Sequence, residues 1–297
     1  MINLTLKQLR YFEALAAERH FGRAADKCAI SQPALSMQIR DLERTLGAVL
    51  IERGPRNIRL TRFGEQFLTR VSAILRSVDE LGDLARASNV ELAGELRIGV
   101  IPTIAPYLLP QIISALDRTH GGLDLQVRET LTDRLLNEVG EGRIDAAIVA
   151  LPVSEPGLVE VPLFSEEFIL VRPSYQADQP VPRVEDLPEM RLLLLEEGHC
   201  FRDQALSFCD AGRARPREGL DGSSLTTLVQ MVAAGLGVTL IPEMAAPVEA
   251  RNSDVATARF SDQRPGRTVG MVWRKSNPLG QQLMRVAEVV HEAAGNA

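Results

Sequence analysis

The chain of 297 residues is 45% hydrophobic and 24% charged, which is typical of a globular protein with a buried core. It contains three cysteines, too few for a secreted disulfide framework, and no run of about 18 uncharged apolar residues that would predict a membrane span. The first residues also lack the apolar core of a secretory signal, so we expect a cytoplasmic protein without a membrane partner.

The net charge of −6 hides an uneven distribution. Residues 1–60 contain ten Lys or Arg against six Asp or Glu, whereas residues 91–297 contain 19 basic and 29 acidic residues. A basic head on an acidic body favours binding of a polyanion by the head alone. Double-stranded DNA is the partner that we expect.

The basic head begins with three predicted helices. Apolar residues at three- and four-residue spacing indicate a helix over residues 5–19, and a short helix follows over residues 21–28. A third spans residues 32–46, because Ser31 can cap its start and Gly47 can end it. Two short helices joined by a tight turn form a helix-turn-helix, whose second helix can enter the major groove of DNA.

The residues expected to touch DNA lie on the outward face of that second helix and on a wing. On the helix they are Gln32, Pro33, Ser36, Met37 and Arg40. Residues 50–53 and 57–60 flank a Gly-Pro-Arg turn, a pattern typical of a two-stranded wing, which would bring Arg53, Arg56 and Arg59 to the phosphate backbone. The alternative is an ordinary three-helix bundle with solvated charges.

A sequence motif extends through both short helices and the wing. It consists of Phe21-Gly22-Arg23-Ala24-Ala25, Ser31-Gln32-Pro33-Ala34-Leu35-Ser36, Leu42-Glu43, Leu46-Gly47, Glu52-Arg53, Leu60-Thr61 and Gly64. In this motif the chain resembles the LysR-type transcriptional regulators, and the resemblance covers the whole chain. It implies a DNA-binding regulator with RNA polymerase as a further partner. Cys28 falls where that family usually has an aliphatic residue, so we interpret it as a buried small hydrophobe.

A long helix is predicted after the head, from residue 61 to about 86. Its apolar residues are spaced 4, 3, 4 and 3 apart, which is typical of a seam between two helices: Phe67, Val71, Ile74, Val78 and Leu81. In the resembling family this helix joins two subunits, which implies a dimer and further association to a tetramer. A helix packed on its own body is the alternative.

After residue 90 the predicted strands and helices alternate. Strand-like runs cover residues 96–100, 124–129, 145–150, 168–172, 191–195 and 238–241, and helical runs cover 106–118, 133–140, 223–235 and 281–294. This alternation favours parallel α/β units. The chain leaves the first group of strands near Leu163 and returns to it through residues 268–273, which implies two lobes with a cleft between them. This arrangement resembles the periplasmic-binding-protein-like effector domain of the same regulators.

The predicted domains follow from these segments. They are a winged helix-turn-helix over 1–60, a linker and dimerisation helix over 61–90, and an α/β regulatory domain over 91–297, with lobe I over 91–164 and 268–297 and lobe II over 165–267.

Ligands of open α/β sheets bind beyond the carboxyl ends of the strands. No phosphate-cradling glycine motif, zinc-protease motif or nucleophile elbow is present, and we expect no cofactor and no metal ion.

One histidine has chemically interesting neighbours. Cys200 follows His199 at the predicted start of a short helix, and Arg202 comes two residues later. A helix start and cationic neighbours favour the thiolate, which attacks a peroxide to give a sulfenic acid, and Cys209 is a candidate to resolve it. In a continuous helix these cysteines would lie roughly 13 Å apart along the axis, so a disulfide would require the segment to refold.

Spacing alone leaves two other interpretations open. The thiols could be incidental, or His199, Cys200 and Cys209 could contribute to a metal site, although three irregularly spaced ligands are a weak pattern. However, Gly198-His199-Cys200, Arg202-Asp203-Gln204-Ala205 and Phe208-Cys209 resemble the redox segment of peroxide-sensing LysR-type activators. Residues 210–220 depart from that pattern, because they look slightly short and are rich in arginine.

That resemblance implies hydrogen peroxide as the signal and antioxidant genes as the target. It makes Cys200 the peroxidatic cysteine and Cys209 the resolving one, and it implies a peroxide pocket lined or supported by Thr103, Thr132, His199, Asp203 and Arg267. Two other functions are weighed against it. One is a LysR-type regulator that binds a small organic effector without redox chemistry, and the other is a thiol peroxidase enzyme, which the basic head argues against.

Overall fold

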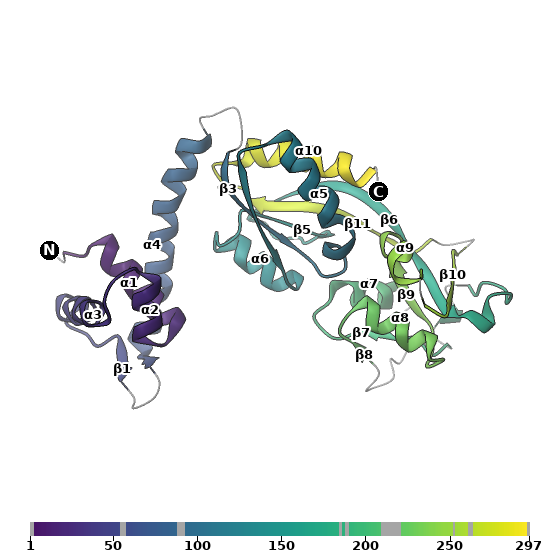
Figure 1. Cartoon of the computed structure of the whole chain (residues 1–297), viewed down its shortest axis with the longest axis horizontal. Coiled ribbons are helices and arrows are strands. Elements are labelled where there is room, and N and C mark those ends of the chain that lie inside the picture. The colour runs from purple at the N-terminus through teal and green to yellow at the C-terminus, as the bar shows by residue number, and fades with distance from the viewer. Residues whose placement is uncertain are drawn as a thin grey trace. The chain divides into compact units, whose positions relative to one another are not determined.

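The structure is a computed structural model that describes residues 3–53, 58–87, 93–183, 186–187, 190–208, 221–251, 253–260 and 264–295. The chain divides into two compact units, Met1–Ala85 and Arg86–Ala297 (Figure 1). Among the described residues, every helix is too short or too polar to span a bilayer.

The first unit is a winged helix-turn-helix followed by a long helix, as predicted. Its elements are α1 (Leu6–Glu18), α2 (Phe21–Lys27), α3 (Gln32–Leu46), β1 (Ile51–Arg53), β2 (Ile58–Leu60) and α4 (Arg62–Ala87). A capping box starts α1, because Thr5 Oγ1 accepts from Gln8 N and Gln8 Oε1 accepts from Thr5 N, both at 3.2 Å. Because caps of this kind are made by neighbouring residues, the starts of these helices can be predicted from the sequence.

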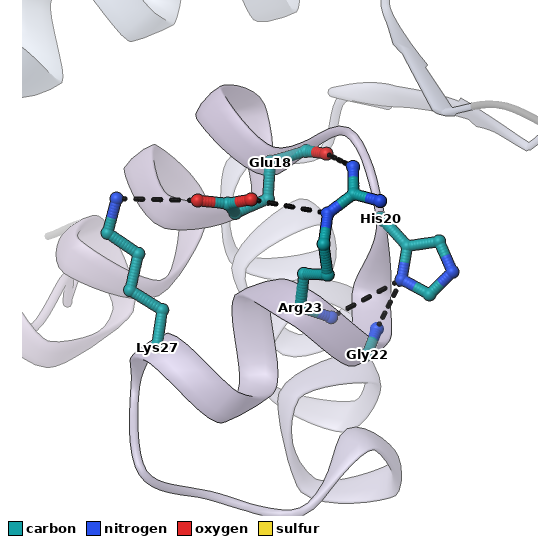
Figure 2. Close-up of polar contacts among 5 residues, drawn as sticks. All are labelled: Glu18, His20, Gly22, Arg23 and Lys27. Carbon is teal, nitrogen blue, oxygen red and sulfur yellow. Dashed lines mark hydrogen bonds and ion pairs between the residues drawn. The ribbon is translucent and has the colours of Figure 1, made fainter.

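The turn between α1 and α2 is fixed by two side chains (Figure 2). His20 Nδ1 accepts from the amides of Gly22 at 3.1 Å and Arg23 at 3.3 Å, so an imidazole caps α2. Glu18 pairs with Arg23 and Lys27, and its carbonyl accepts from Arg23 Nη2 at 2.6 Å. A Cβ on Gly22 would approach the His20 ring to 3.0 Å, which explains the glycine at this position.

The recognition helix α3 is joined to the wing by a side chain. Ser31 Oγ accepts from Ala34 N at 3.4 Å, and Gly47 ends the helix with φ of 66°. From the last turns, Glu43 Oε1 accepts from the amides of Leu50 at 2.8 Å and Ile51 at 3.2 Å. The wing strand β1 therefore starts at a place set by α3.

The predicted seam of α4 is partly wrong. Val71 is fully buried in the core of the head, and the Phe67 ring lies 5.5 Å from that of Phe12, so both pack on the head. The exposed stripe begins later, with Ile74 47% exposed and Leu81 65% exposed, and it continues to Leu84. Periodicity identified the apolar face correctly, but the first half of that face is used by the head itself.

Cys28 ends α2 and packs against the core of the head. Its side chain is half-buried rather than fully buried as predicted. Burial raises the pKa of the Cys28 thiol, and the nearby Lys27 lowers it by less. The thiol is therefore protonated at neutral pH, in agreement with its interpretation as a small hydrophobe.

The second unit is an α/β structure of two lobes. Its elements are β3 (Gly94–Val100), α5 (Ala105–Thr119), β4 (Leu123–Glu129), α6 (Thr132–Gly140), β5 (Ala146–Leu151), β6 (Leu158–Pro173), η1 (Ser174–Gln176), β7 (Leu194–Leu195), α7 (Cys200–Phe208), β8 (Asp221–Gly222), α8 (Leu225–Ala233), β9 (Thr239–Pro242), η3 (Glu243–Ala245), α9 (Ala246–Glu249), β10 (Val255–Ala258), β11 (Gly266–Arg274) and α10 (Gly280–Gly295).

The main sheet has mixed rather than parallel topology. Its strand order is β10-β6-β11-β5-β3-β4, with β9 also on β6. Strand β3 pairs parallel to β4 and β5, but β11 runs antiparallel to β5 and β6, and β9 and β10 run antiparallel to β6. The prediction of parallel units is therefore correct for the β3–β5 part of this sheet and for the small β7–β8 pair in lobe II.

Two long strands connect the lobes. Strand β6 contributes Leu163 to the core of lobe I and Phe168 to the core of lobe II, and it runs beside β11 (Figure 1). In lobe I, α5 and α10 cover one face of the sheet and α6 covers the other (Figure 1). The strands that cross between the lobes carry the polar residues described next.

Candidate functional site

A cavity of about 990 Å³ draws its walls from both lobes. One wall is α7, which presents Cys200, Asp203, Gln204 and Ser207. Phe208, the last residue of α7, belongs to the same wall. The remaining walls are the start of α6, the end of β5 and the residues after it, the start of η3 and the two crossing strands, with Thr132, Asp133, Leu136, Ala150, Leu151, Pro152, Val153, Ser165, Glu166, Glu167, Glu243, Arg264, Gly266, Arg267 and Thr268.

Cys200 is the first residue of α7 and is partly buried. Gly198 precedes it with φ of 94°, and a Cβ there would lie 3.1 Å from the Leu131 side chain. Glycine therefore permits the tight turn that aims Cys200 into the cavity. Because Gln204 lies four positions later, both side chains share one face of α7.

Arg267 is the fully buried cation of this cavity, and it holds Thr103. Its Nη1 donates to Thr103 Oγ1 at 2.7 Å and its Nη2 donates to the Thr103 carbonyl at 3.0 Å. Guanidinium has no acceptor, so the Thr103 oxygen is the acceptor and its own O–H is left to donate elsewhere. The ring of Phe201 lies 5.8 Å from Arg267 Cζ and helps to shield the pair from water.

Two polar atoms at the cavity are poised for a ligand. Thr132 Oγ1 and Gln204 Oε1 are buried, and neither has a hydrogen-bond partner among the described residues. Buried polar atoms are normally paired, because leaving one unpaired costs about 1–3 kcal/mol. Both residues line the same cavity as Cys200, so a small polar molecule there would satisfy them.

The expectation that Arg202 and His199 stabilise the Cys200 thiolate by their charge needs correction. Arg202 Nη1 donates to the Leu195 carbonyl at 2.6 Å and to Asp221 Oδ1 at 2.9 Å, so its charge is engaged by Asp221. Burial lowers the pKa of His199 below its usual value, an effect that Glu196 only partly offsets, so the imidazole is neutral at pH 7. Neither side chain lines the cavity within the described part of the chain.

The other predicted positions divide into those that the structure brings together and those it does not describe. Cys200, Thr132, Asp203 and Arg267 line one cavity, and Thr103 joins them through Arg267. Cys209 lies outside the described residues. Within the described residues, no group of three or more His, Cys, Asp or Glu side chains is arranged to hold a metal ion.

Sequence reasoning missed Glu166. This residue lies on β6 directly opposite Arg267 on β11, and its Oε1 accepts from Arg267 Nε at 2.8 Å. The other oxygen, Oε2, accepts from Met244 N at 3.1 Å. The only signal in the sequence is an acidic pair on a long strand, which does not indicate its partner 101 residues away.

The helix-turn-helix presents the predicted DNA-facing side chains. Gln32, Pro33, Met37 and Arg40 are exposed on α3, and Ser36 is partly exposed. Among the described residues the Arg40 side chain makes no hydrogen bond or ion pair, whereas Arg44 Nη2 lies 2.7 Å from Asp41 Oδ1. On the wing, Arg59 is exposed on β2 and Arg53 belongs to β1, while Arg56 lies outside the described residues.

Two families match the chain in separate segments. The bacterial regulatory helix-turn-helix family of LysR type matches residues 6–65, and the LysR substrate binding domain matches residues 89–295. The second match alone covers more than half of the chain.

Similar proteins are named as regulators of genes, one of them for genes that hydrogen peroxide induces. A "Probable hydrogen peroxide-inducible genes activator" of Streptomyces viridosporus is 42% identical over 97% of this chain and 94% of its own length. The "DNA-binding transcriptional dual regulator OxyR" of Escherichia coli K12 is 40% identical over 97% of this chain and 95% of its own.

Solved structures of similar sequence share the fold. A full-length cysteine variant of OxyR from Pseudomonas aeruginosa has a TM-score of 0.76 at 36% identity and covers 97% of this chain and 95% of its own. A hydrogen-peroxide-bound cysteine variant of OxyR from Corynebacterium glutamicum has a TM-score of 0.69 at 37% identity and covers 99% and 94%. The chain therefore belongs to the LysR family of bacterial helix-turn-helix transcriptional regulators.

Proposed function

We propose that this regulator senses hydrogen peroxide through Cys200 and changes its binding to promoter DNA in response. The observation that carries the proposal is the arrangement of Cys200 in one cavity with Arg267, which holds the Thr103 hydroxyl by a 2.7 Å hydrogen bond. In this arrangement a nucleophile and a buried cation share one cavity, and a hydroxyl is hydrogen-bonded to that cation, which supports a reaction with peroxide. The name of the similar Streptomyces protein and the peroxide-bound structure from Corynebacterium glutamicum support the same signal.

The first chemical step is attack by the Cys200 thiolate on one peroxide oxygen. The S–O bond forms as the O–O bond breaks, so sulfur is oxidised to a sulfenic acid and the departing hydroxide takes a proton to become water. Thr103 and Arg267 can hold the peroxide oxygens and stabilise the departing one. Thr132 lies within the cavity to accept or donate a hydrogen bond, and Asp203 and the neutral His199 support the segment around Cys200.

The second step is disulfide formation with Cys209, which releases the sulfenic oxygen as water. Cys200 to Phe208 forms a continuous helix, which separates these two Cα atoms by roughly 12 Å. One further residue can recover at most about 3.8 Å, whereas a disulfide needs Cα atoms within about 7 Å. The proposed bond therefore requires α7 to unwind, which makes the helix the element that oxidation switches.

The output of the switch is DNA binding by paired heads. Residues 1–60 bind DNA, residues 61–90 join subunits into dimers that assemble to tetramers, and residues 91–297 carry the sensor. Oxidation changes subunit packing and so the spacing of two half-sites on a promoter of antioxidant genes. Contact with RNA polymerase then converts DNA binding into transcription.

A small organic effector is the second candidate, and the cavity volume favours it. Ligand pockets typically have volumes of about 300–1,000 Å³, and this cavity lies at the upper end. The buried Arg267 charge is already balanced by Glu166, so a second anion beside it would lack a charge partner, whereas neutral hydrogen peroxide needs none. The redox function is therefore the better supported of the two.

Peroxide titration of the reduced protein tests the proposal. The wild type should gain a disulfide at one equivalent of peroxide, with free thiols falling from three to one, and its DNA footprint should change. Cys200→Ser should not react, Cys209→Ser should hold a sulfenic acid that a dimedone probe traps, and Cys28→Ser should behave as the wild type. Oxidation of Cys200→Ser at substoichiometric peroxide would refute the sensor and favour the organic effector.

A further inference from the structure

We propose that Glu166 is a positioning residue for peroxide reduction: it holds the Arg267 guanidinium in the one orientation that presents the Thr103 hydroxyl to Cys200. The inference rests on the proposed function of Cys200. Glu166 does not touch the thiol in this arrangement; it acts through Arg267.

The guanidinium is fixed along three of its edges. Nε donates to Glu166 Oε1 at 2.8 Å, Nη1 to Thr103 Oγ1 at 2.7 Å and Nη2 to the Thr103 carbonyl at 3.0 Å. Because the group is planar and rigid, fixing Nε sets the directions of the other donors. The Thr103 contact thus depends on a residue that lies on the other side of the guanidinium.

Burial makes this dependence strong. The Arg267 side chain is 0% exposed and the Glu166 side chain is 6% exposed. A buried cation without a carboxylate partner is costly, so Arg267 would have to turn toward another anion or admit water. Glu167 and Glu243 already pair with arginines, which leaves Asp133 and Asp203 on the cavity wall as alternative partners. A turn toward either of them would pull the guanidinium away from Thr103.

The carboxylate itself is fixed at both oxygens. Oε2 accepts from the amide of Met244 at 3.1 Å, and Met244 belongs to η3 of lobe II. Thr103 precedes α5 of lobe I, while Arg267 and Glu166 lie on the strands that cross between the lobes. The hydrogen bonds from Thr103 through Arg267 and Glu166 to Met244 thus cross the cavity from one lobe to the other. The position of the Thr103 hydroxyl relative to the Cys200 thiol therefore depends on the relative position of the two lobes.

Glu166→Gln is the informative variant, because it keeps the size and removes one acceptor. If the amide oxygen accepts from Arg267, the amide nitrogen faces the Met244 N–H, donor against donor. We expect the second-order rate constant of Cys200 with hydrogen peroxide to fall roughly tenfold to a hundredfold, because reactive geometry is sensitive to shifts near 1 Å. The rate constant with iodoacetamide, which needs only the thiol, should stay within about twofold of the wild type.

A matched control separates positioning from loss of stability. Asp145 is another buried carboxylate, which accepts from Arg97 Nη2 at 2.9 Å in lobe I and does not line the cavity. Asp145→Asn should lower the melting temperature at least as much as Glu166→Gln, yet leave the peroxide rate constant unchanged. Glu166→Asp keeps the charge but can reach only one of the two donors, Arg267 Nε and Met244 N. It should give an intermediate peroxide rate constant, and it replaces Glu166→Gln as the test variant if that variant does not fold.

The outcomes are distinct. An unchanged peroxide rate constant in Glu166→Gln and Glu166→Asp, or an equal fall in the peroxide and iodoacetamide rate constants, would overturn the positioning role while leaving the proposed function intact. A wild-type Cys200 that reacts with peroxide no faster than a free thiol would overturn both. A selective fall in the peroxide rate constant of the Glu166 variants alone supports the inference.

Discussion

Phe208 packs edge-on against Phe168, with ring centroids 5.9 Å apart and ring planes at 88°. Phe208 is the last residue of the helix that Cys200 begins, and Phe168 lies on β6 in the core of lobe II. Near the other end of α7, Phe201 packs on the same ring at 4.8 Å. One aromatic ring therefore holds both ends of the helix that would have to unwind for the proposed disulfide to form.

Phe208→Ala should accelerate the second chemical step more than it changes the first. Aromatic pairs of this geometry contribute about 0.5–1.5 kcal/mol beyond their burial, so losing one end should favour the unwound helix by roughly twofold to tenfold. The lifetime of the Cys200 sulfenic acid, followed by dimedone trapping after a peroxide pulse, should shorten by that factor. Phe201→Ala should have a different effect, because it removes the ring beside Arg267 and should therefore slow the first step, the reaction of Cys200 with peroxide. A sulfenic acid that lasts longer in Phe208→Ala would contradict this role of α7.

Thr103→Val should slow the peroxide reaction of Cys200 by at least about tenfold, since it removes the hydroxyl but keeps the shape. The buried valine also leaves Arg267 Nη1 without its 2.7 Å acceptor. Stopped-flow measurement of the peroxide rate constant checks this, and Thr103→Ser, which retains the hydroxyl, should recover most of the rate. Equal rates in Val and Ser variants would show that the hydroxyl plays no part.

The stability of the regulatory unit should fall in acid because of His199. Burial lowers the pKa of His199 in the folded chain, whereas the unfolded chain titrates near the usual value of about 6.5. Below that pH the unfolded state binds more protons, so the free energy of unfolding decreases as pH falls until the folded imidazole also becomes protonated. Urea unfolding at pH 7.5 and pH 5.0 should show a smaller loss of stability for His199→Gln than for the wild type. An identical loss in both proteins would show that His199 does not contribute.

Local signals made the helix-turn-helix predictable. Thr5, Ser31 and Gly47 cap or end helices through contacts within a few residues, so their chemistry is visible in sequence. The start of α7 at Cys200 was equally legible, because a strand and the glycine at position 198 precede it.

Partners distant in the chain were not predictable. Periodicity showed that Val71 lies on an apolar face of α4, but not that the head rather than a second subunit covers it. Arg202 is two residues from Cys200, yet its side chain reaches Asp221. The cross-strand pair of Glu166 and Arg267 depends on the register of β6 against β11, which neither segment encodes alone.

Arg40→Ala should weaken specific DNA binding, while Arg44→Ala should have little effect. Arg40 is exposed on α3 without a partner among the described residues, whereas the Arg44 charge is balanced by Asp41 at 2.7 Å. Losing a base contact costs about 1–3 kcal/mol of binding free energy and relaxes specificity at one base pair. Losing a phosphate contact instead weakens binding to all sequences and reduces by about one the slope of log affinity against log salt concentration. Binding isotherms on a promoter fragment at several salt concentrations distinguish these. A larger effect from Arg44 would mean that α3 meets DNA through a different face.

Ile74→Asp should reduce the oligomeric state. Ile74 lies on the stripe of α4 that the head leaves exposed, together with Leu81 and Leu84, so it is the part of the predicted seam still free to meet a second subunit. A charge buried between two helices is strongly unfavourable, and paired heads bind two half-sites far better than one. Analytical ultracentrifugation should therefore show a smaller species, with weaker binding to a two-half-site promoter.

The control for this prediction is Thr69→Asp, which adds the same charge at an exposed position five residues earlier, on roughly the opposite face of α4. It should leave both mass and promoter affinity unchanged, because that face does not belong to the stripe. If Ile74→Asp also keeps the wild-type mass and affinity, α4 does not join subunits through Ile74. Subunit contacts would then have to lie elsewhere on the chain, and the link between α7 and the spacing of the heads would need another route.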